Sequence, residues 1–110
     1  MDPTLISGTL DLMIMEIVSS GPSYGYEITQ SVKERSGERF ELKEGSLYPG
    51  LHRLERKKFL ESSWREVEGR RRKYYQLTAA GKKELAAKRA VWEQFASGIN
   101  GILGMNCGLV

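Results

Sequence analysis

Residues 45–58, GSLYPGLHRLERKK, constrain the fold of this chain more than any other stretch. Leu47, Leu51 and Leu54 recur at i, i+4 and i+7, so we expect them on the inward face of one helix. The opposite face of that helix is polar and mostly basic. Such a helix packs its apolar face on a core and turns its charges toward solvent or an acidic partner.

We expect this helix to begin at Ser46, because serine is a good N-cap residue. Pro49 then falls in the first turn, where proline is tolerated because the first N–H groups of a helix have no intrahelical acceptor. The faces away from the core carry Tyr48, His52 and Arg53.

A β-hairpin signal follows directly, in EVEGRRRKYYQL at 66–77. The alternation over 60–65 predicts one strand, the β propensity of 74–77 predicts a second, and Glu68-Gly69 predicts the turn between them. Two strands alone are barely stable, so this hairpin should rest on the helices. Four consecutive cations are placed around the turn: Arg70, Arg71, Arg72 and Lys73.

Two helices are predicted upstream. The first runs over about 8–20, with Ser7 as its N-cap and Gly21-Pro22 as its stop. The second runs over about 23–36 and ends at Gly37, which supplies a left-handed C-terminal residue. Gly25 lies in its first turn, where we expect the close approach of another backbone.

The C-terminal segment predicts one long helix, capped by Thr78 and running to about residue 102. About 25 helical residues extend roughly 37 Å, which is too long for the small body to cover. Glycines at 98, 101 and 104 predict fraying at its end. A heptad seam typical of a two-stranded coiled coil contains five apolar residues: Leu85, Trp92, Phe95, Ile99 and Ile102.

The order of three helices, two strands and a helix predicts a mainly α fold with a β-hairpin wing, that is, a winged helix-turn-helix with a long C-terminal dimerisation helix. With 110 residues the chain is one domain overall. Within it we expect a DNA-binding region over 5–78 and a dimerisation helix over 79–104.

Composition excludes several classes of protein. Cys107 is the only cysteine, so no internal disulfide is possible, and a free thiol fits a reducing cytoplasm. The N-terminus lacks the features of a signal peptide, and the apolar run 12–15 is too short to span a bilayer. With one histidine, one cysteine and no nucleotide-binding loop, we expect no enzyme, no metal and no cofactor.

Three motifs resemble the PadR family of bacterial transcriptional regulators: SGPSYGYEI at 20–28, GSLYPGLHRLE at 45–55 and GRRRKYYQLTAAGKKEL at 69–85. The resemblance covers about residues 5–103 and is closest to the small subgroup with a single C-terminal helix. It implies a DNA-binding regulator, usually a repressor, in which Tyr48 contacts DNA. The tail 105–110 lies beyond the match.

A basic helix beside a basic hairpin suits the groove and phosphates of duplex DNA. Alternatives remain for individual residues: Tyr24 and Tyr48 as core aromatics, His52 as a solvated side chain, Arg53 in a surface ion pair, and the cation run as a solvated face. The residues predicted to contact DNA are Tyr24, Ser46, Tyr48, Pro49, His52, Arg53, Arg70, Arg71, Arg72 and Lys73.

The aromatic residues of the last helix allow two interpretations. Trp92 and Phe95 either pack across a homodimer interface or form the walls of an effector pocket for a planar hydrophobic small molecule. The predicted partners are therefore double-stranded DNA, a second copy of the chain and, in the second interpretation, that small molecule. The alternative to DNA binding is a ligand-binding or protein–protein adaptor dimer that uses the winged fold without DNA.

Overall fold

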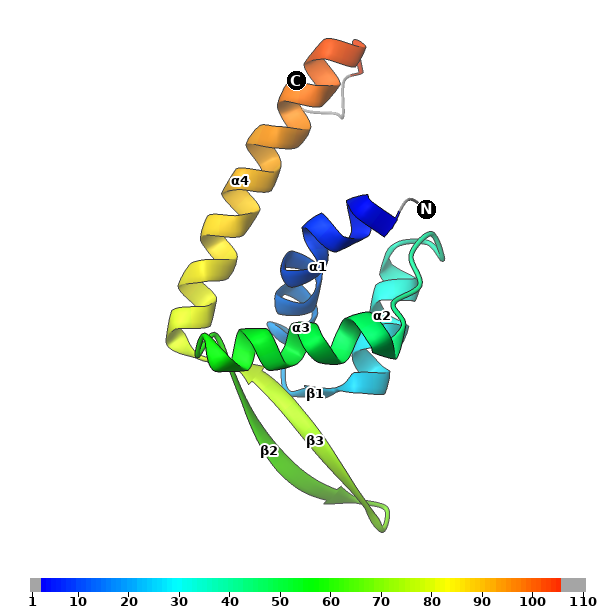
Figure 1. The fold of residues 1–110 in the computed structure, drawn as a ribbon, viewed down its shortest axis with the longest axis vertical. Helices are drawn as coiled ribbons and strands as arrows, with labels where there is room; N and C mark the ends of the chain where they lie inside the picture. Colours follow the sequence, from blue (N-terminus) through cyan, green and yellow to red (C-terminus); the bar gives the residue numbers. More distant parts are fainter. Residues whose placement is uncertain (1–2, 106–110) are drawn as a thin grey trace.

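Four helices and a small antiparallel sheet follow one another along residues 3–105, the part of the chain that the computed structural model describes (Figure 1). The elements are α1 (Pro3–Val18), β1 (Ser23–Tyr24), α2 (Gly25–Arg35), α3 (Glu44–Arg56), β2 (Leu60–Val67), β3 (Arg70–Leu77) and α4 (Ala79–Leu103). The predicted fold class, a winged helix with a long C-terminal helix, is confirmed. Cys107 and the rest of the tail from 106 lie outside the described residues.

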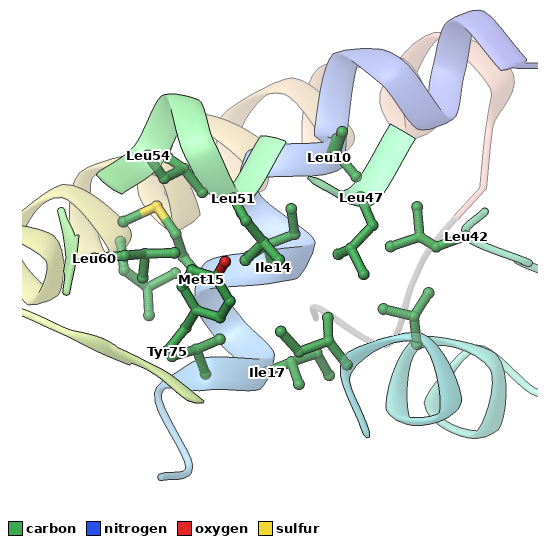
Figure 2. Packing of buried hydrophobic residues seen from close by; sticks show 14 residues of the cluster. Leu10, Ile14, Met15, Ile17, Leu42, Leu47, Leu51, Leu54, Leu60 and Tyr75 are labelled. Carbon is green, nitrogen blue, oxygen red and sulfur yellow. The ribbon is translucent and has the colours of Figure 1, made fainter. Parts of the chain in front are cut away.

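Helix α1 is central, because it packs against α2, α3, α4 and β3. The periodic leucines of α3 are fully buried as predicted, and they meet Ile14 and Met15 of α1 and Tyr75 of β3 in one core (Figure 2). This core fixes α3 and β3 relative to each other. Its members are Leu10, Ile14, Met15, Ile17, Val18, Ile28, Val32, Leu42, Leu47, Leu51, Leu54, Leu60, Tyr75 and Leu85.

The predicted start of α1 was wrong by five residues, since the helix begins at Pro3 and Ser7 lies inside it. Proline suits a first helical position, and nothing between it and residue 8 interrupts the helix. The Thr9 hydroxyl donates to the Leu5 carbonyl within this added turn, at 2.9 Å. The stop at Gly21-Pro22 is confirmed, because the helix ends at Val18.

The predicted second helix started too early. Ser23 and Tyr24 form β1, which pairs with β3 in the register Ser23↔Tyr75 and Tyr24↔Tyr74, so the sheet has the order β1-β3-β2. A strand of this length carries no periodicity, and only its pairing with β3 defines it. Helix α2 begins at Gly25, and Gly37 takes the predicted left-handed conformation, with φ of 64°.

The start of α3 was also wrong. Its N-cap is Lys43, whose carbonyl accepts from the backbone N–H of Ser46 at 3.0 Å and of Leu47 at 2.9 Å. Ser46 is therefore a residue of the first turn and not the cap. Pro49 lies inside the helix rather than in its first turn. The extra turn forms because the backbone hydrogen bonds to Lys43 do not require a capping side chain.

The hairpin of β2 and β3, which we call the wing, has the predicted turn at Glu68-Gly69, with φ of 52° and 77°. Its strands are longer than predicted, and Arg70–Lys73 lie within β3, in an antiparallel register that pairs Val67 with Arg70. The four cations therefore alternate between two faces of a strand instead of surrounding a loop.

Helix α4 begins after the predicted cap, and the Thr78 hydroxyl accepts from the Gly81 N–H at 3.0 Å. Its first turn packs closely against the backbone of Phe59, the residue just before β2. A Cβ added at Gly81 would be 2.0 Å from the Phe59 carbonyl oxygen. Leu85 was predicted in the dimer seam, but it is only 7% exposed and belongs to the core of this chain. A leucine in the first half of α4 is still close enough to α1 to be covered.

The second half of α4 leaves the body, on the side away from the wing (Figure 1). Contrary to the predicted fraying, the helix is continuous through residues 98 and 101 and ends at a left-handed Gly104. Trp92, Phe95 and Ile99 are exposed on it, as an unpaired seam requires. The chain measures 52 × 29 × 23 Å along its principal axes, because α4 and the wing extend in opposite directions.

Candidate nucleic-acid interface

A hollow of about 330 Å³ lies where α3 meets the wing and the start of α2. We call it the corner pocket. It contains most of the residues predicted to contact DNA, although they come from three separate segments of the chain. Its lining consists of Tyr24, Gly25, Tyr48, His52, Trp64, Arg71, Arg72, Lys73 and Tyr75.

Tyr48 projects from the first half of α3 and is 38% exposed. Its ring lies over Gly25, where an added Cβ would come within 2.5 Å of the hydroxyl oxygen. The close approach expected at Gly25 therefore exists, but it involves a side chain and not another backbone. Along the described residues the Tyr48 hydroxyl makes no hydrogen bond, so it can donate to an external acceptor. His52 is exposed one turn later, and the centroid of its ring lies 6.5 Å from that of Tyr48.

Three predicted residues lie near this pocket without lining it. Ser46 and Pro49 are exposed on the first half of α3, and Arg70 is exposed beside the turn of the wing. All three lie on the elements that form the pocket. They extend the polar surface around the pocket along α3 and the wing.

Arg53 is not brought together with the others. Its guanidinium donates to the Asp11 carboxylate of α1, in an ion pair that is 39% exposed at the arginine and 21% at the aspartate. The pair lines a different hollow, between α1 and α4. Arg53 therefore has the surface ion pair expected as its alternative, and it does not belong to the interface with the other predicted residues.

Glu55 near the end of α3 joins that helix to the wing. It accepts a hydrogen bond from the Ser62 hydroxyl of β2, and its carboxylate lies 3.8 Å from the Lys73 ammonium of β3. The charge of Lys73 is therefore partly neutralised inside the protein. Sequence reasoning treated Glu55 only as a negative charge, because its partners lie 7 and 18 positions away along the chain.

Four of the five cations of the wing lie over aromatic rings. The centroid distances range from 4.5 to 5.5 Å, within the 6 Å limit typical of cation–π contacts. Sequence reasoning missed Trp64 of β2 as a site residue, because its contact with Arg71 depends on the register of the hairpin. The pairs are Arg65 over Tyr74, Arg71 over Trp64, Arg72 over Tyr24 and Lys73 over Tyr75.

Tyr75 connects the corner pocket to the core. It lines the pocket, yet it is only 2% exposed. Burial raises the pKa of its phenol above the ordinary value of 10.0, and the nearby negative charge of Glu55 raises the pKa further. The phenol is therefore neutral at physiological pH.

A second hollow, of about 640 Å³, lies between α1 and the middle of α4. We call it the α1–α4 groove. Trp92 and Phe95 line one wall, with ring centroids 6.0 Å apart, and Leu5 lines another. Trp92 is 45% exposed and Phe95 is 59% exposed. Ile99 and Ile102 continue the apolar strip toward the end of α4 but do not line the groove.

Two kinds of feature are absent from residues 3–105. No helix there is long and apolar enough to cross a membrane. No group of three or more His, Cys, Asp or Glu side chains in the same part of the chain is placed to hold a metal ion.

Comparison with known proteins identifies the family. The model of the transcriptional regulator PadR-like family matches residues 14–87. Transcriptional regulator Rv3488 of Mycobacterium tuberculosis is 36% identical over 90 residues, which cover 82% of this chain and 81% of that protein.

Solved structures agree with this match. A transcriptional regulator from Clostridium thermocellum superposes with a TM-score of 0.82 at 34% identity, over 89% of this chain and 96% of that one. A PadR family transcription regulator from Clostridium difficile superposes with a TM-score of 0.78 at 39% identity, over 87% and 99%. The chain is therefore a transcriptional regulator of the PadR-like family.

Proposed function

We propose that this regulator binds duplex DNA with α3 in the major groove and the wing on the adjacent backbone or minor groove. One observation carries the proposal: the corner pocket gathers Tyr48 and His52 of α3 with Arg71 and Arg72 of β3. DNA binding through a winged helix is typical of this family. The wing arginines would position the protein, because phosphate contacts carry no sequence information.

Sequence would be read by the first half of α3. A helix in the major groove offers its N-terminal residues to base edges, and here Ser46, Tyr48 and Pro49 are exposed in that half. His52 lies one turn further along the same helix, where it can reach a neighbouring base pair.

We further propose that the protein is a homodimer on a palindromic operator and acts as a repressor in the cytoplasm, without catalysis or a cofactor. The exposed strip of Trp92, Phe95, Ile99 and Ile102 supports dimer contact through α4, because a continuous exposed apolar strip on a helix usually meets a partner. Two-fold symmetry then spaces the half-sites about 34 Å apart, or a multiple of that distance.

The α1–α4 groove supports a second role for the same region. Its aromatic wall of Trp92 and Phe95 suits a planar hydrophobic effector that relieves repression. Such a compound would change DNA affinity only through its different affinities for the two forms of the dimer.

Trp92→Ala should loosen the dimer in sedimentation equilibrium or abolish the quenching of tryptophan emission by planar dyes. A Trp64→Phe background removes the other emitter. If dimer and quenching both persist, neither role stands.

A footprint on the DNA that flanks the protein's own gene tests the central proposal. We expect protection of two half-sites related by a dyad, at the spacing given above. In a gel mobility-shift assay, failure of the protein to shift any duplex at low salt would refute DNA binding. It would favour the adaptor dimer, which uses the winged fold without nucleic acid.

A further inference from the structure

Trp64 is the large exposed apolar residue of the wing. It is 58% exposed, although β2 has polar residues at most of its other exposed positions. The indole does not belong to the core, which contains Leu60 and Tyr75 from the same sheet. Its position on the rim of the corner pocket therefore calls for another explanation.

The register of the hairpin brings Trp64 to Arg71. Trp64 pairs with Lys73 and Glu66 pairs with Arg71, so Trp64 and Arg71 are diagonal neighbours on one face of the sheet. Diagonal neighbours are within reach when one side chain is aromatic and the other is long. The guanidinium carbon of Arg71 lies 4.9 Å from the centroid of the indole ring.

The charge of Arg71 remains available. Lys73 on the same face is paired with Glu55, and Arg53 is paired with Asp11. By contrast, Arg71 has no carboxylate partner among residues 3–105, even though Glu66 lies opposite it in the ladder. Stacking uses the flat face of a guanidinium and leaves its N–H donors, which lie in the plane, free to bind an anion.

We propose that Trp64 is a positioning residue, whose indole holds the Arg71 guanidinium in the orientation that binds a DNA phosphate. This inference rests on the DNA binding proposed above. An unsupported arginine must lose rotamer freedom when it is fixed on a partner. A stack that already exists in the free protein removes part of that loss at the moment of binding. Arg72 over Tyr24 repeats the arrangement, at 4.5 Å.

The test is a double-mutant cycle with Trp64→Val and Arg71→Ala in the full chain, on a duplex of random sequence at several salt concentrations. Valine keeps the β propensity of the strand but has no ring. We expect Trp64→Val alone to weaken binding about two- to five-fold, as an exposed cation–π contact predicts. Its slope of log K against log salt should stay unchanged, because Arg71 still meets the phosphate.

Arg71→Ala should instead flatten that slope by about 0.9. In the Arg71→Ala background, Trp64→Val should have no further effect on affinity. An equal loss in both backgrounds would overturn the inference, since Trp64 would then act on DNA or on the hairpin directly. No loss in the wild-type background would also overturn it.

Trp64→Tyr is the conservative variant, because it keeps an aromatic face for Arg71. We expect it to bind within about two-fold of wild type, and affinity as low as that of Trp64→Val would refute a role for the ring face. Thermal unfolding of each variant shows whether the hairpin stays folded.

If Arg71→Ala left the slope of log K against log salt unchanged, the proposed phosphate contact of the wing would be refuted. If Arg71→Ala flattened it while Trp64→Val did nothing, the positioning role alone would fail.

Discussion

Gly25→Ala should separate the stability of this protein from its DNA affinity. An added Cβ would lie 2.5 Å from the Tyr48 hydroxyl oxygen, whereas ordinary contact begins at 3.4 Å, so the hydroxyl must retreat by about 0.9 Å. The nearest obstacle is the end of a side chain and not backbone, and Tyr48 can swing toward solvent because it is partly exposed. We therefore expect the fold to accept the alanine.

The two effects on stability nearly cancel. Alanine in place of a glycine in a compatible conformation stabilises a protein by about 0.4–1 kcal/mol, and an off-rotamer tyrosine costs about 0.5–1.5 kcal/mol. The free energy of unfolding should thus change by less than about 1 kcal/mol. DNA binding should change more, since a hydrogen bond to a charged phosphate is worth about 1.5–3 kcal/mol, or roughly 10- to 150-fold in affinity.

Fluorescence anisotropy with a labelled operator duplex measures the affinity, and thermal unfolding measures the stability. Gly8→Ala is the matched control, because nothing lies within 4 Å of a Cβ at that position and Gly8 lies on α1, outside the corner pocket and the apolar strip of α4. Gly25→Ala and Tyr48→Phe should not be additive, since both remove the same hydroxyl interaction with DNA. Wild-type affinity for Gly25→Ala, or full additivity with Tyr48→Phe, would refute the reasoning.

Three other changes test other parts of the molecule. Arg70, Arg71 and Arg72 changed together to Ala should weaken binding to all duplexes and flatten the salt slope by about 0.9 for each phosphate that the wing no longer neutralises, and an unchanged slope would contradict contact by the wing. Gly81→Ala should lower the free energy of unfolding in urea by about 1–3 kcal/mol, because its Cβ would lie 2.0 Å from the Phe59 carbonyl oxygen. A variant as stable as the wild type would contradict this, since α4 would then be able to shift away from Phe59. Above pH 10 the unfolded Tyr75 phenol ionises before the folded one, whose pKa is raised, so stability should fall as pH rises there. Tyr75→Phe should remove that part of the decrease, and an identical pH profile would contradict it.

The order of the four helices and the two strands of the wing was predictable from local patterns. The leucines of α3 repeat at the period of a helix, the wing combines β propensity with a Glu-Gly turn, and Thr78 caps α4 as its sequence indicates. These features depend on residues close together in the chain, and the tertiary structure did not override them. The helix starts were less predictable, because Ser46 is a good cap that the backbone did not use.

The candidate interface was predictable only in part. Residue types and spacing pointed to Tyr48, His52 and the arginines of β3, which the fold gathers around the corner pocket. The pairing of Arg53 with Asp11 spans 42 positions, and no local pattern encodes it. Trp64 was missed because its contact with Arg71 requires the register of the hairpin as well as its existence.

The amino-acid sequence by itself determined the four helices and the hairpin, that the chain carries a basic wing, and that it resembles PadR regulators, whereas β1 exists only through its pairing with β3. Only the tertiary structure decided which cations are neutralised, which rest on aromatic rings, and that Leu85 belongs to the core while Trp92 does not. The physical reason is range. Helix and turn propensities act over a few residues, whereas burial and charge pairing depend on which distant segments the shared core brings together.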